Sequence, residues 1–464
     1  MRLVTILVIA LSGLAGIPRI YAQSVFIGQL NSVGDGTNGF HIYGASLSSG
    51  YSTFPLNYGT TAALSTVNRT PAFDASGATS LGYLHVAPRS SFNLTYTPSY
   101  YRRLDSLHQQ SFTENLSMSV HHGLGAKWDW QASLNGDDSD ITSFLFSPAP
   151  ATLVSANQSS FEDLSAASLG GQVSNPQLSG ILNTPASAGP ARFLVYGSRL
   201  VSATATTGLT YNKSDRLTFN FDVGASHFER FDGQGGPGVV NPRTWSERAA
   251  ARMSYALSPR TYLTADADTS HTFSQYSNTY LARGILGVGR ILSPRWFVDV
   301  HGGGSGVFQG SGSSSIAVIN RRSYNVSGNL GFRTTSQTLM GNYGRSIFNP
   351  YGLGPQVTET YSGSWYWRRT GSPWAAYANG TRQRFLGSNP LLGNLSGWNG
   401  AAGVSRELSR QFSLTASYGY FENSALQADQ SLIKLSRYAA RLTLVWAPAR
   451  HSVESPDTGL SNFN

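Results

Sequence analysis

The chain has 464 residues and no cysteine, and 12% of its residues are charged, about half the fraction usual in a soluble domain. The mean hydropathy of −0.19 excludes a bundle of membrane-spanning helices, and the absence of cysteine excludes a disulfide framework. A net charge of +9 is compatible with nucleic acid, but no basic cluster or nucleic-acid motif accompanies it, so nucleic acid is not an expected partner.

The first residues have the order of a secretory signal peptide. Arg2 precedes an apolar run from Leu3 to Ile17, and the small residue Ala22 stands before the expected cleavage point. A positive start, an apolar centre and a small residue at the end are the three parts of such a peptide. Residues 1–22 are therefore predicted to be removed on export.

The next segment, 23–89, is rich in Gly, Ser and Thr. It is predicted to be a periplasmic leader or a plug-like segment. Parts of it, at 38–60 or 79–87, are alternatively an extra pair of strands.

From residue 90 onward, apolar and polar residues alternate along one segment after another. In one of them Leu217, Phe219 and Phe221 alternate with Thr218 and Asn220. Such alternation predicts a strand with one apolar face. Several segments have 12 or more residues, which is enough to cross a bilayer at a tilt. The sequence therefore predicts an all-β protein, a transmembrane antiparallel β-barrel of about 16 strands, with 14–18 possible. The expected strands are 90–102, 110–123, 126–135, 199–211, 216–231, 243–257, 260–276, 279–291, 296–309, 320–334, 337–348, 356–369, 374–387, 396–408, 411–423 and 433–446.

The connections between these segments differ in length. The near-identical runs 257–260 and 292–295 are short Ser-Pro turns, whereas 232–242 and 310–319 are longer and rich in Gly. Short turns on one side and longer loops on the other are typical of an outer-membrane barrel. The longest connection, 136–198, is predicted to be an extracellular loop.

The last expected strand closes the barrel. Tyr438, Ala440, Leu442, Leu444 and Trp446 form its apolar face, which ends in an aromatic residue. Aromatic residues mark the membrane interface of such barrels. The barrel is therefore expected over 90–446, and the C-terminal tail, 447–464, follows it.

Two short runs resemble a known group of proteins. The run from Phe92 to Arg102 resembles the opening of a poorly characterised barrel family, and the run from Leu292 to Trp296 resembles its recurrent turn. That porin-like family comprises bacterial outer-membrane β-barrel proteins of soil bacteria such as acidobacteria, some of them associated with exopolysaccharide export. The resemblance implies the barrel fold and supplies no catalytic or binding residue.

Charged residues on the polar faces of the expected strands are candidates for the lumen. Rings of Arg favour anions, and opposed Arg and Asp create a transverse field across a pore. The alternative is that Arg and Asp simply knit together an interior that must be polar. The lumen-lining candidates are Arg248, Arg252, Arg333, Arg382, Arg384, Arg437, Arg441, Asp222, Asp266, Asp268 and Asp299.

Tryptophans gather near the ends of the expected strands, as in an aromatic girdle at the membrane interface. The expected interface aromatics are Trp128, Trp130, Trp245, Trp296, Trp365, Trp367 and Trp446.

No enzymatic activity, metal or cofactor is expected. The chain lacks the HExxH, GxSxG and GxxxxGK[ST] motifs, and an acidic cluster at 137–140 lacks the Gly and the final Glu of an EF-hand. His227 and His271 lie near strand ends, with Glu229 and Asp268 close in sequence, and form the one arrangement that an enzyme could use.

The first functional hypothesis is a porin-like channel in the bacterial outer membrane for the passive passage of small, preferentially anionic solutes. The alternatives are a conduit for exopolysaccharide export and a closed barrel that acts in adhesion or as a scaffold. Expected partners are outer-membrane lipid and lipopolysaccharide, the barrel-assembly machinery through the C-terminal strand, and, for the export hypothesis, periplasmic export components.

Overall fold

The computed structural model describes residues 38–53, 72–104, 110–140, 199–230, 243–274, 278–310, 321–348, 356–369, 371–386, 395–409, 411–426 and 432–447. The expected signal peptide, the loop beyond Asp140 and the tail beyond Ala447 lie outside these ranges. Within them, no helix is long and apolar enough to cross a membrane.

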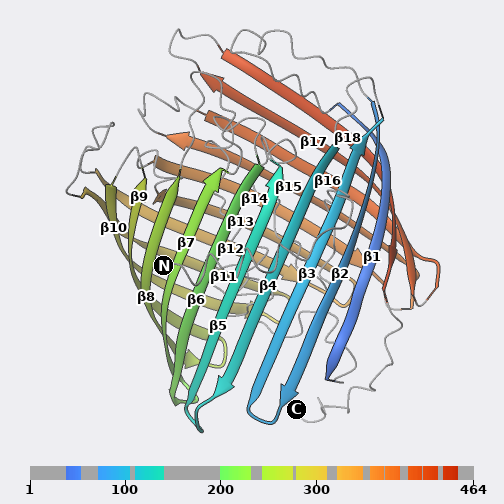
Figure 1. Cartoon of the computed structure of the whole chain (residues 1–464). Helices are drawn as coiled ribbons and strands as arrows, with labels where there is room; N and C mark the ends of the chain where they lie inside the picture. The colour runs from blue at the N-terminus through green and yellow to red at the C-terminus, as the bar shows by residue number, and fades with distance from the viewer. Residues whose placement is uncertain are drawn as a thin grey trace.

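The chain forms one closed antiparallel sheet of 18 strands. Each strand pairs with the next one along the chain, and β1 pairs with β18 to close the barrel (Figure 1). The strands are β1 (Gly39–Ser52), β2 (Ala72–Ala87), β3 (Ser90–Arg103), β4 (Gln110–Gly123), β5 (Trp128–Asp140), β6 (Arg199–Ser214), β7 (Leu217–Arg230), β8 (Thr244–Ser258), β9 (Thr261–Ser274), β10 (Asn278–Ser293), β11 (Trp296–Gln309), β12 (Arg321–Arg333), β13 (Gln337–Phe348), β14 (Gln356–Arg368), β15 (Trp374–Leu386), β16 (Leu395–Glu407), β17 (Phe412–Leu426) and β18 (Leu432–Trp446).

The barrel begins earlier than the sequence predicts. Within 23–89 the first expectation of a leader is wrong for the residues of β1 and β2. The alternative of an extra pair of strands is confirmed there and gives 18 strands, the upper end of the expected 14–18. A register shift between Ile42 and Gly44 interrupts the alternation of β1, and beyond it most residues on both faces are small. Neither feature gives the amphipathic pattern by which a strand is recognised.

The other sixteen strands lie close to their predicted ranges. The bounds of β4, β11 and β13 are the predicted ones. β5 extends to Asp140, so the first five residues of the expected loop 136–198 belong to a strand.

The short connections share one end of the barrel and are stabilised locally. In the turn after β8, the Ser258 hydroxyl accepts a hydrogen bond from the Arg260 amide at 3.2 Å, and in the turn after β10 the Ser293 hydroxyl accepts one from the Arg295 amide at 3.2 Å. Serine in this position replaces a backbone partner and favours a tight reversal. The repeated Ser-Pro-Arg runs therefore build equivalent turns.

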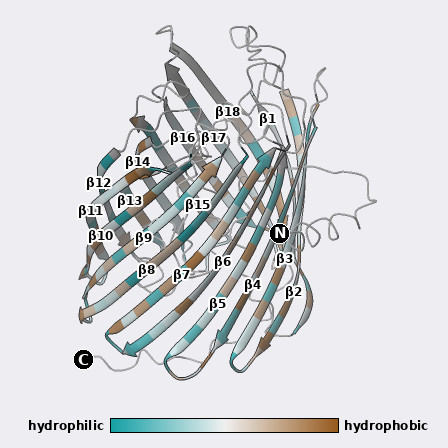
Figure 2. Ribbon diagram, turned by 60° about the vertical axis from the view of Figure 1, so that its left-hand side comes forward, coloured by the Kyte–Doolittle hydropathy of each residue, from teal (hydrophilic) through white to brown (hydrophobic). Residues whose placement is uncertain are grey.

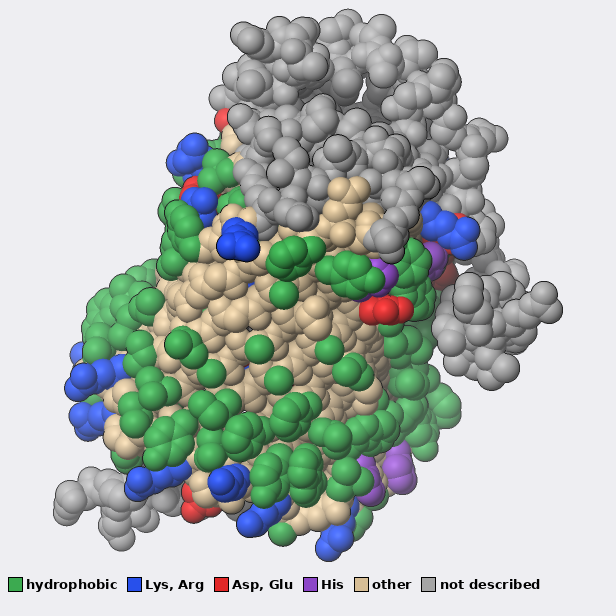
Figure 3. Space-filling model, turned by 90° about the vertical axis from the view of Figure 1, so that its left-hand side faces the viewer, with side chains coloured by type: hydrophobic (Ala, Val, Ile, Leu, Met, Phe, Trp, Pro, Cys, Tyr) green, Lys and Arg blue, Asp and Glu red, His purple; other side chains and the backbone are tan. Residues whose placement is uncertain are grey.

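The two faces of the wall differ in exposure. Neighbouring residues of β18 show this, because Leu442 is 51% exposed whereas Arg441 is 8% exposed. The alternation of hydropathy along the strands is visible in Figure 2, and Figure 3 shows a belt of hydrophobic side chains near the short-turn end of the outer surface. The apolar face is therefore the outer one, as in a barrel whose surroundings are apolar.

The inner face is packed by rings that lie over glycines of the adjacent strand. Phe297 covers Gly331 and Tyr262 covers Gly289, and a Cβ atom at either glycine would overlap the ring. Phe297 is 3% exposed. A glycine beside an aromatic residue on the next strand is a known means of holding register in a curved sheet.

We expect Gly331→Ala to lower the free energy of unfolding by about 1–3 kcal/mol, because the new methyl group displaces the Phe297 ring. The measurement is the urea midpoint of the barrel refolded into lipid vesicles. Gly328→Ala on the same strand is the control, since the nearest atom to its Cβ is the Asp299 carbonyl oxygen at 3.9 Å. Equal effects of the two substitutions would contradict the role of the ring.

Candidate functional site

The inner wall of β7 to β10 carries six charged side chains in close succession, here called the charge ladder. Its members alternate in sign from strand to strand and come from four consecutive strands. They are Asp222, Arg248, Arg252, Asp266, Asp268 and Arg283.

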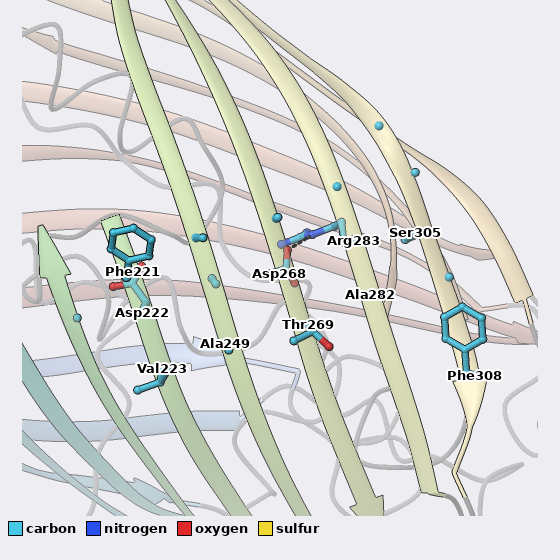
Figure 4. Close-up of a pocket in the computed structure, with 18 of the residues that line it drawn as sticks. Phe221, Asp222, Val223, Ala249, Asp268, Thr269, Ala282, Arg283, Ser305 and Phe308 are labelled. Atoms are coloured by element: carbon cyan, nitrogen blue, oxygen red, sulfur yellow. Dashed lines mark hydrogen bonds and ion pairs between the residues drawn. The ribbon is translucent and has the colours of Figure 1, made fainter. Parts of the chain in front are cut away.

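Two ion pairs form the centre of the charge ladder. Arg252 stands opposite Asp266 in the β8–β9 register and is paired with it through Nε. Arg283 stands opposite Asp268, and its Nε lies 2.5 Å from Asp268 Oδ1 (Figure 4). The side chains of the second pair are 24% and 6% exposed. These pairs therefore lie against the wall and keep little contact with water.

The other two members extend the alternation of charge. Asp222 is opposite Ala250, so it lies between Arg248 and Arg252 on the same face of the wall. Both arginines act on Asp222 electrostatically, and Asp268 acts on Arg248. With three arginines and three aspartates, the charge ladder is neutral as a whole.

A third ion pair, outside the charge ladder, crosses β1, the strand that closes the barrel against β18. Arg441 of β18 and Asp74 of β2 both pair in register with Gly50 of β1. Arg441 Nη2 lies 3.4 Å from Asp74 Oδ2, and the Tyr101 hydroxyl donates to the same oxygen at 3.3 Å. A Cβ atom at Gly50 would overlap Arg441, so glycine is what lets the guanidinium reach across β1.

A third polar group is buried on the inner wall near the middle of β11. Asp299 is 0% exposed and His301 is 3% exposed. The His301 Nε2 atom lies 2.8 Å from the Asp299 carboxylate, and Asn329 donates to Asp299 Oδ2 at 3.2 Å. Buried polar groups with this many partners stabilise the wall rather than meet a solute.

An apolar cluster lies above the charge ladder, toward the long loops. Val307 and Leu281 face inward on β11 and β10, opposite each other in register. Ile347 and Val357, at the loop ends of β13 and β14, pack against them together with Leu386. The pairing of β12 with β13 ends at Val326, five residues short of Arg321 at the loop end of β12, so the end of β13 beyond Arg345 is no longer held beside β12. The cluster therefore joins the loop ends of β13, β14 and β15 to β10 and β11.

Most of the lumen-lining candidates lie on the inner face, and two do not. Arg382 and Arg384 are exposed on the outer face, where Arg382 lies in register with Tyr361 and Trp398. Their assignment to the lumen is therefore wrong. In β15, small and polar residues occupy both faces at this end, so the sequence does not reveal the direction of either arginine. The side chain of Arg437 lies outside the described ones. The candidates on the inner face are Arg248, Arg252, Arg333, Arg441, Asp222, Asp266, Asp268 and Asp299.

Three residues of the inner wall are missed by sequence reasoning. Arg283 stands in β10, where Gly287 and Gly289 on the inner face blur the alternation. Asp74 falls in the segment taken for a leader. His301 follows the expected inward residue Asp299 by two positions, and this spacing was the signal that could have identified it.

The tryptophans lie mainly at the short-turn end of the outer face. Trp128, Trp296 and Trp374 stand at the first position of β5, β11 and β15 and are 39–44% exposed. Trp446 is the last residue of β18 and lies at the same rim. Trp245 is the second residue of β8 and lies at the opposite end, near the long loops. Trp130 and Trp367 also lie within three residues of a short turn, and Trp365 lies four residues from one.

The large cavity found on the described part of the barrel is a groove on the outer wall and not part of the lumen. It encloses about 1350 Å³ and is floored by small outward residues such as Ala251, Ala267 and Gly304. Phe221 and Phe308 border it on opposite sides (Figure 4). The groove therefore opens to the outside of the barrel and not to the lumen.

The histidines considered for catalysis do not assemble a catalytic group. His271 faces outward and stacks on Tyr280 at 4.2 Å, whereas Asp268 faces inward. His227 Nε2 lies 3.1 Å from Glu229 at the outer rim, and no described nucleophile is paired with them. The described residues also contain no group of three or more His, Cys, Asp or Glu that could hold a metal ion.

Comparisons with known proteins find similarity of structure alone. No protein-family model and no curated protein matches the sequence. The fold resembles Acinetobacter baumannii OccAB4, with a TM-score of 0.43 and 10% identity over 89% of this chain and 98% of that one. It also resembles the FrpB iron transporter from Neisseria meningitidis (F5-1 variant), with a TM-score of 0.44 and 10% identity over 88% and 82%. A third similar structure is Pseudomonas aeruginosa OccK2 (OpdF) in complex with glucuronate, with a TM-score of 0.42 and 10% identity over 87% and 97%. Similarities this low carry no argument about what passes through this barrel.

A double-mutant cycle tests the charge ladder. Arg252→Gln and Asp266→Asn should each destabilise the barrel, because either single change leaves a partly buried charge unpaired. We expect the sum of the two single effects to exceed the effect of the double substitution by roughly 1–3 kcal/mol, which is the coupling energy of the pair. Urea unfolding from lipid vesicles measures it.

The control for this cycle is the Arg368–Glu407 pair at the short-turn rim, whose side chains are 43% and 49% exposed. Its coupling is expected to lie below about 1 kcal/mol because water screens it. If the coupling energy of the control pair were as large as that of Arg252 and Asp266, burial on the inner wall would not be the reason for the strength of the Arg252–Asp266 pair.

Proposed function

We propose that this protein spans the bacterial outer membrane and acts as a channel for small solutes. The closed sheet leaves no strand edge, its outer face is apolar, and tryptophans gather at one rim. A closed antiparallel barrel with these features satisfies all the backbone hydrogen bonds that a bilayer core leaves without water.

The charge ladder is the observation that carries the channel proposal. Fully buried wall groups such as Asp299 are explained by packing, but the ladder concentrates six charges on one inner wall where neutral polar residues would satisfy the fold. Paired charges of alternating sign hold oriented dipoles along the inner wall, beside the proposed path of a polar or charged solute.

The described inner wall does not support a strong preference for anions. The expected preference depends on a surplus of inward arginine, and Arg382 and Arg384 face outward. Since the charge ladder is neutral, we expect a channel that discriminates weakly by the sign of charge.

Planar bilayer recording tests this function. We expect the refolded protein to give steady single-channel currents and a reversal potential close to zero in a tenfold KCl gradient. Silence from barrels that show the mobility shift of a folded barrel would contradict the channel, and would favour the closed-barrel hypothesis.

Reciprocal substitutions in the charge ladder test its place in the pore. Asp268→Asn leaves Arg248 and Arg283 without this carboxylate, so the reversal potential should move toward that of chloride. Arg283→Gln should move it toward that of potassium. The outward Arg406→Gln at the short-turn rim is the control and should leave the value unchanged, because Arg406 lies over the outer Trp374 ring. Shifts of the same sign for both ladder variants would exclude an electrostatic effect.

The apolar cluster favours a second candidate, a barrel that is closed at its loop end. Ile347→Ser should raise the single-channel conductance if the cluster restricts the pathway, because Ile347 and Val307 belong to the same buried cluster. Leu339→Ser is the control on the same strand, since its side chain is 46% exposed on the outer face. An unchanged conductance of the Ile347 variant would show that solutes do not pass the cluster.

A further inference from the structure

Two arginines stand on the outer wall, where an apolar surface is expected. Arg382 and Arg384 are separated by one residue on β15, so both face outward, and both are exposed. Placing a guanidinium in the hydrocarbon of a bilayer costs several kcal/mol. A pair of them on this face therefore needs a compensating partner.

Their height on the barrel corresponds to a lipid headgroup. Arg382 lies eight residues beyond Trp374, which marks the short-turn rim. At about 3.3 Å per residue and a tilt of about 45°, eight residues advance roughly 19 Å along the membrane normal, and Arg384 roughly 5 Å more. The apolar band of such barrels is about 25 Å tall. Arg384 therefore stands at the headgroup boundary of the leaflet on the long-loop side, and Arg382 stands a few ångström below it, from where its long side chain extends toward the same headgroups.

The neighbouring side chains orient the two arginines and leave their charge available. Arg382 lies 5.1 Å from the ring centroid of Trp398, a cation–π contact that keeps its planar group against the wall. Arg384 is in register with Glu359, but that carboxylate is paired with Arg345 at 2.7 Å. Among the described residues, neither Arg382 nor Arg384 has an ion pair with a carboxylate.

Aromatic residues border this patch. Tyr361 is opposite Arg382 and stacks against Tyr343 at 5.0 Å, and Tyr324, 56% exposed, lies under Arg345 at 4.2 Å. Aromatic rings at this height mark the boundary between hydrocarbon and headgroup. Two exposed guanidinium groups about 7 Å apart above such a boundary suit the oxygens of one phosphate group.

We propose that Arg382 and Arg384 form a binding site for a phosphate group of the phosphorylated glycolipid in the outer leaflet. The proposal rests on the proposed place of the barrel in the outer membrane, and not on its conducting solutes. Arg345 and Trp398 position the site, and phosphate supplies the charge that the wall lacks.

Binding of lipid A to the folded, detergent-solubilised barrel tests this site. Native mass spectrometry would compare lipid A that carries its phosphates with the same lipid after enzymatic dephosphorylation. We expect the apparent affinity to fall about tenfold on dephosphorylation, and by a similar factor for the Arg382→Gln/Arg384→Gln variant. The difference in electrophoretic mobility between the folded and the heat-denatured barrel confirms that each variant is compared in the folded state.

The matched control is Arg406→Gln, since Arg406 lies 5.2 Å from the ring centroid of Trp374 at the opposite rim. We expect it to bind lipid A like the unaltered protein. Equal binding of both lipids, or an equal loss in the control, would overturn the proposal. Displacement of bound lipid A by millimolar inorganic phosphate would assign the site to free phosphate instead. None of these outcomes depends on conductance, so a failed channel and a failed lipid site are distinguishable.

Discussion

The structure depends on closure of the hydrogen-bonded sheet between β1 and β18. An open edge in a bilayer would leave a row of backbone groups without partners, each at a cost of several kcal/mol. Eight residue pairs, from Ala45–Trp446 to Ser52–Ala439, make this contact. Because β1 has few large side chains, it adds little packing, and the Arg441–Asp74 pair ties its two neighbours together over Gly50. The weakest strand by composition is thus held by a contact between the strands on either side.

The fold follows from the sequence wherever one face of a strand is apolar and the other is polar. β4, β11 and β13 have the bounds that alternation predicts. β1 is missed because most of its residues beyond the register shift are small on both faces, so its membership of the barrel is decided by closure and not by its own pattern. Pairing between strands far apart in sequence is a property that no local window contains.

The candidate site is predictable only in part, for a related reason. The inward direction of Asp222 can be read from the large apolar residues Phe221 and Val223 on either side of it. In β15 the neighbours of Arg382 are Thr381 and Gln383. Because both are polar, they do not indicate whether Arg382 faces the lumen or the outside. Which residues pair across strands, such as Arg283 with Asp268, depends on register, and register is set by the turns and by the rings that cover glycines.

The neutrality of the charge ladder limits how far its field reaches. Charges of alternating sign a few ångström apart cancel at distances larger than their spacing, and salt screens what remains within about 8 Å. A solute crossing the middle of a wide lumen would therefore hardly meet the field of Arg283 and Asp268. Leu281 of the apolar cluster stands two residues from Arg283 on the same inner face. If the cluster restricts the proposed pathway beside the charge ladder, a solute that passes it is brought within the range of these charges. Selectivity in the proposed channel would for that reason depend on the apolar cluster and on the neutral set of ion pairs together.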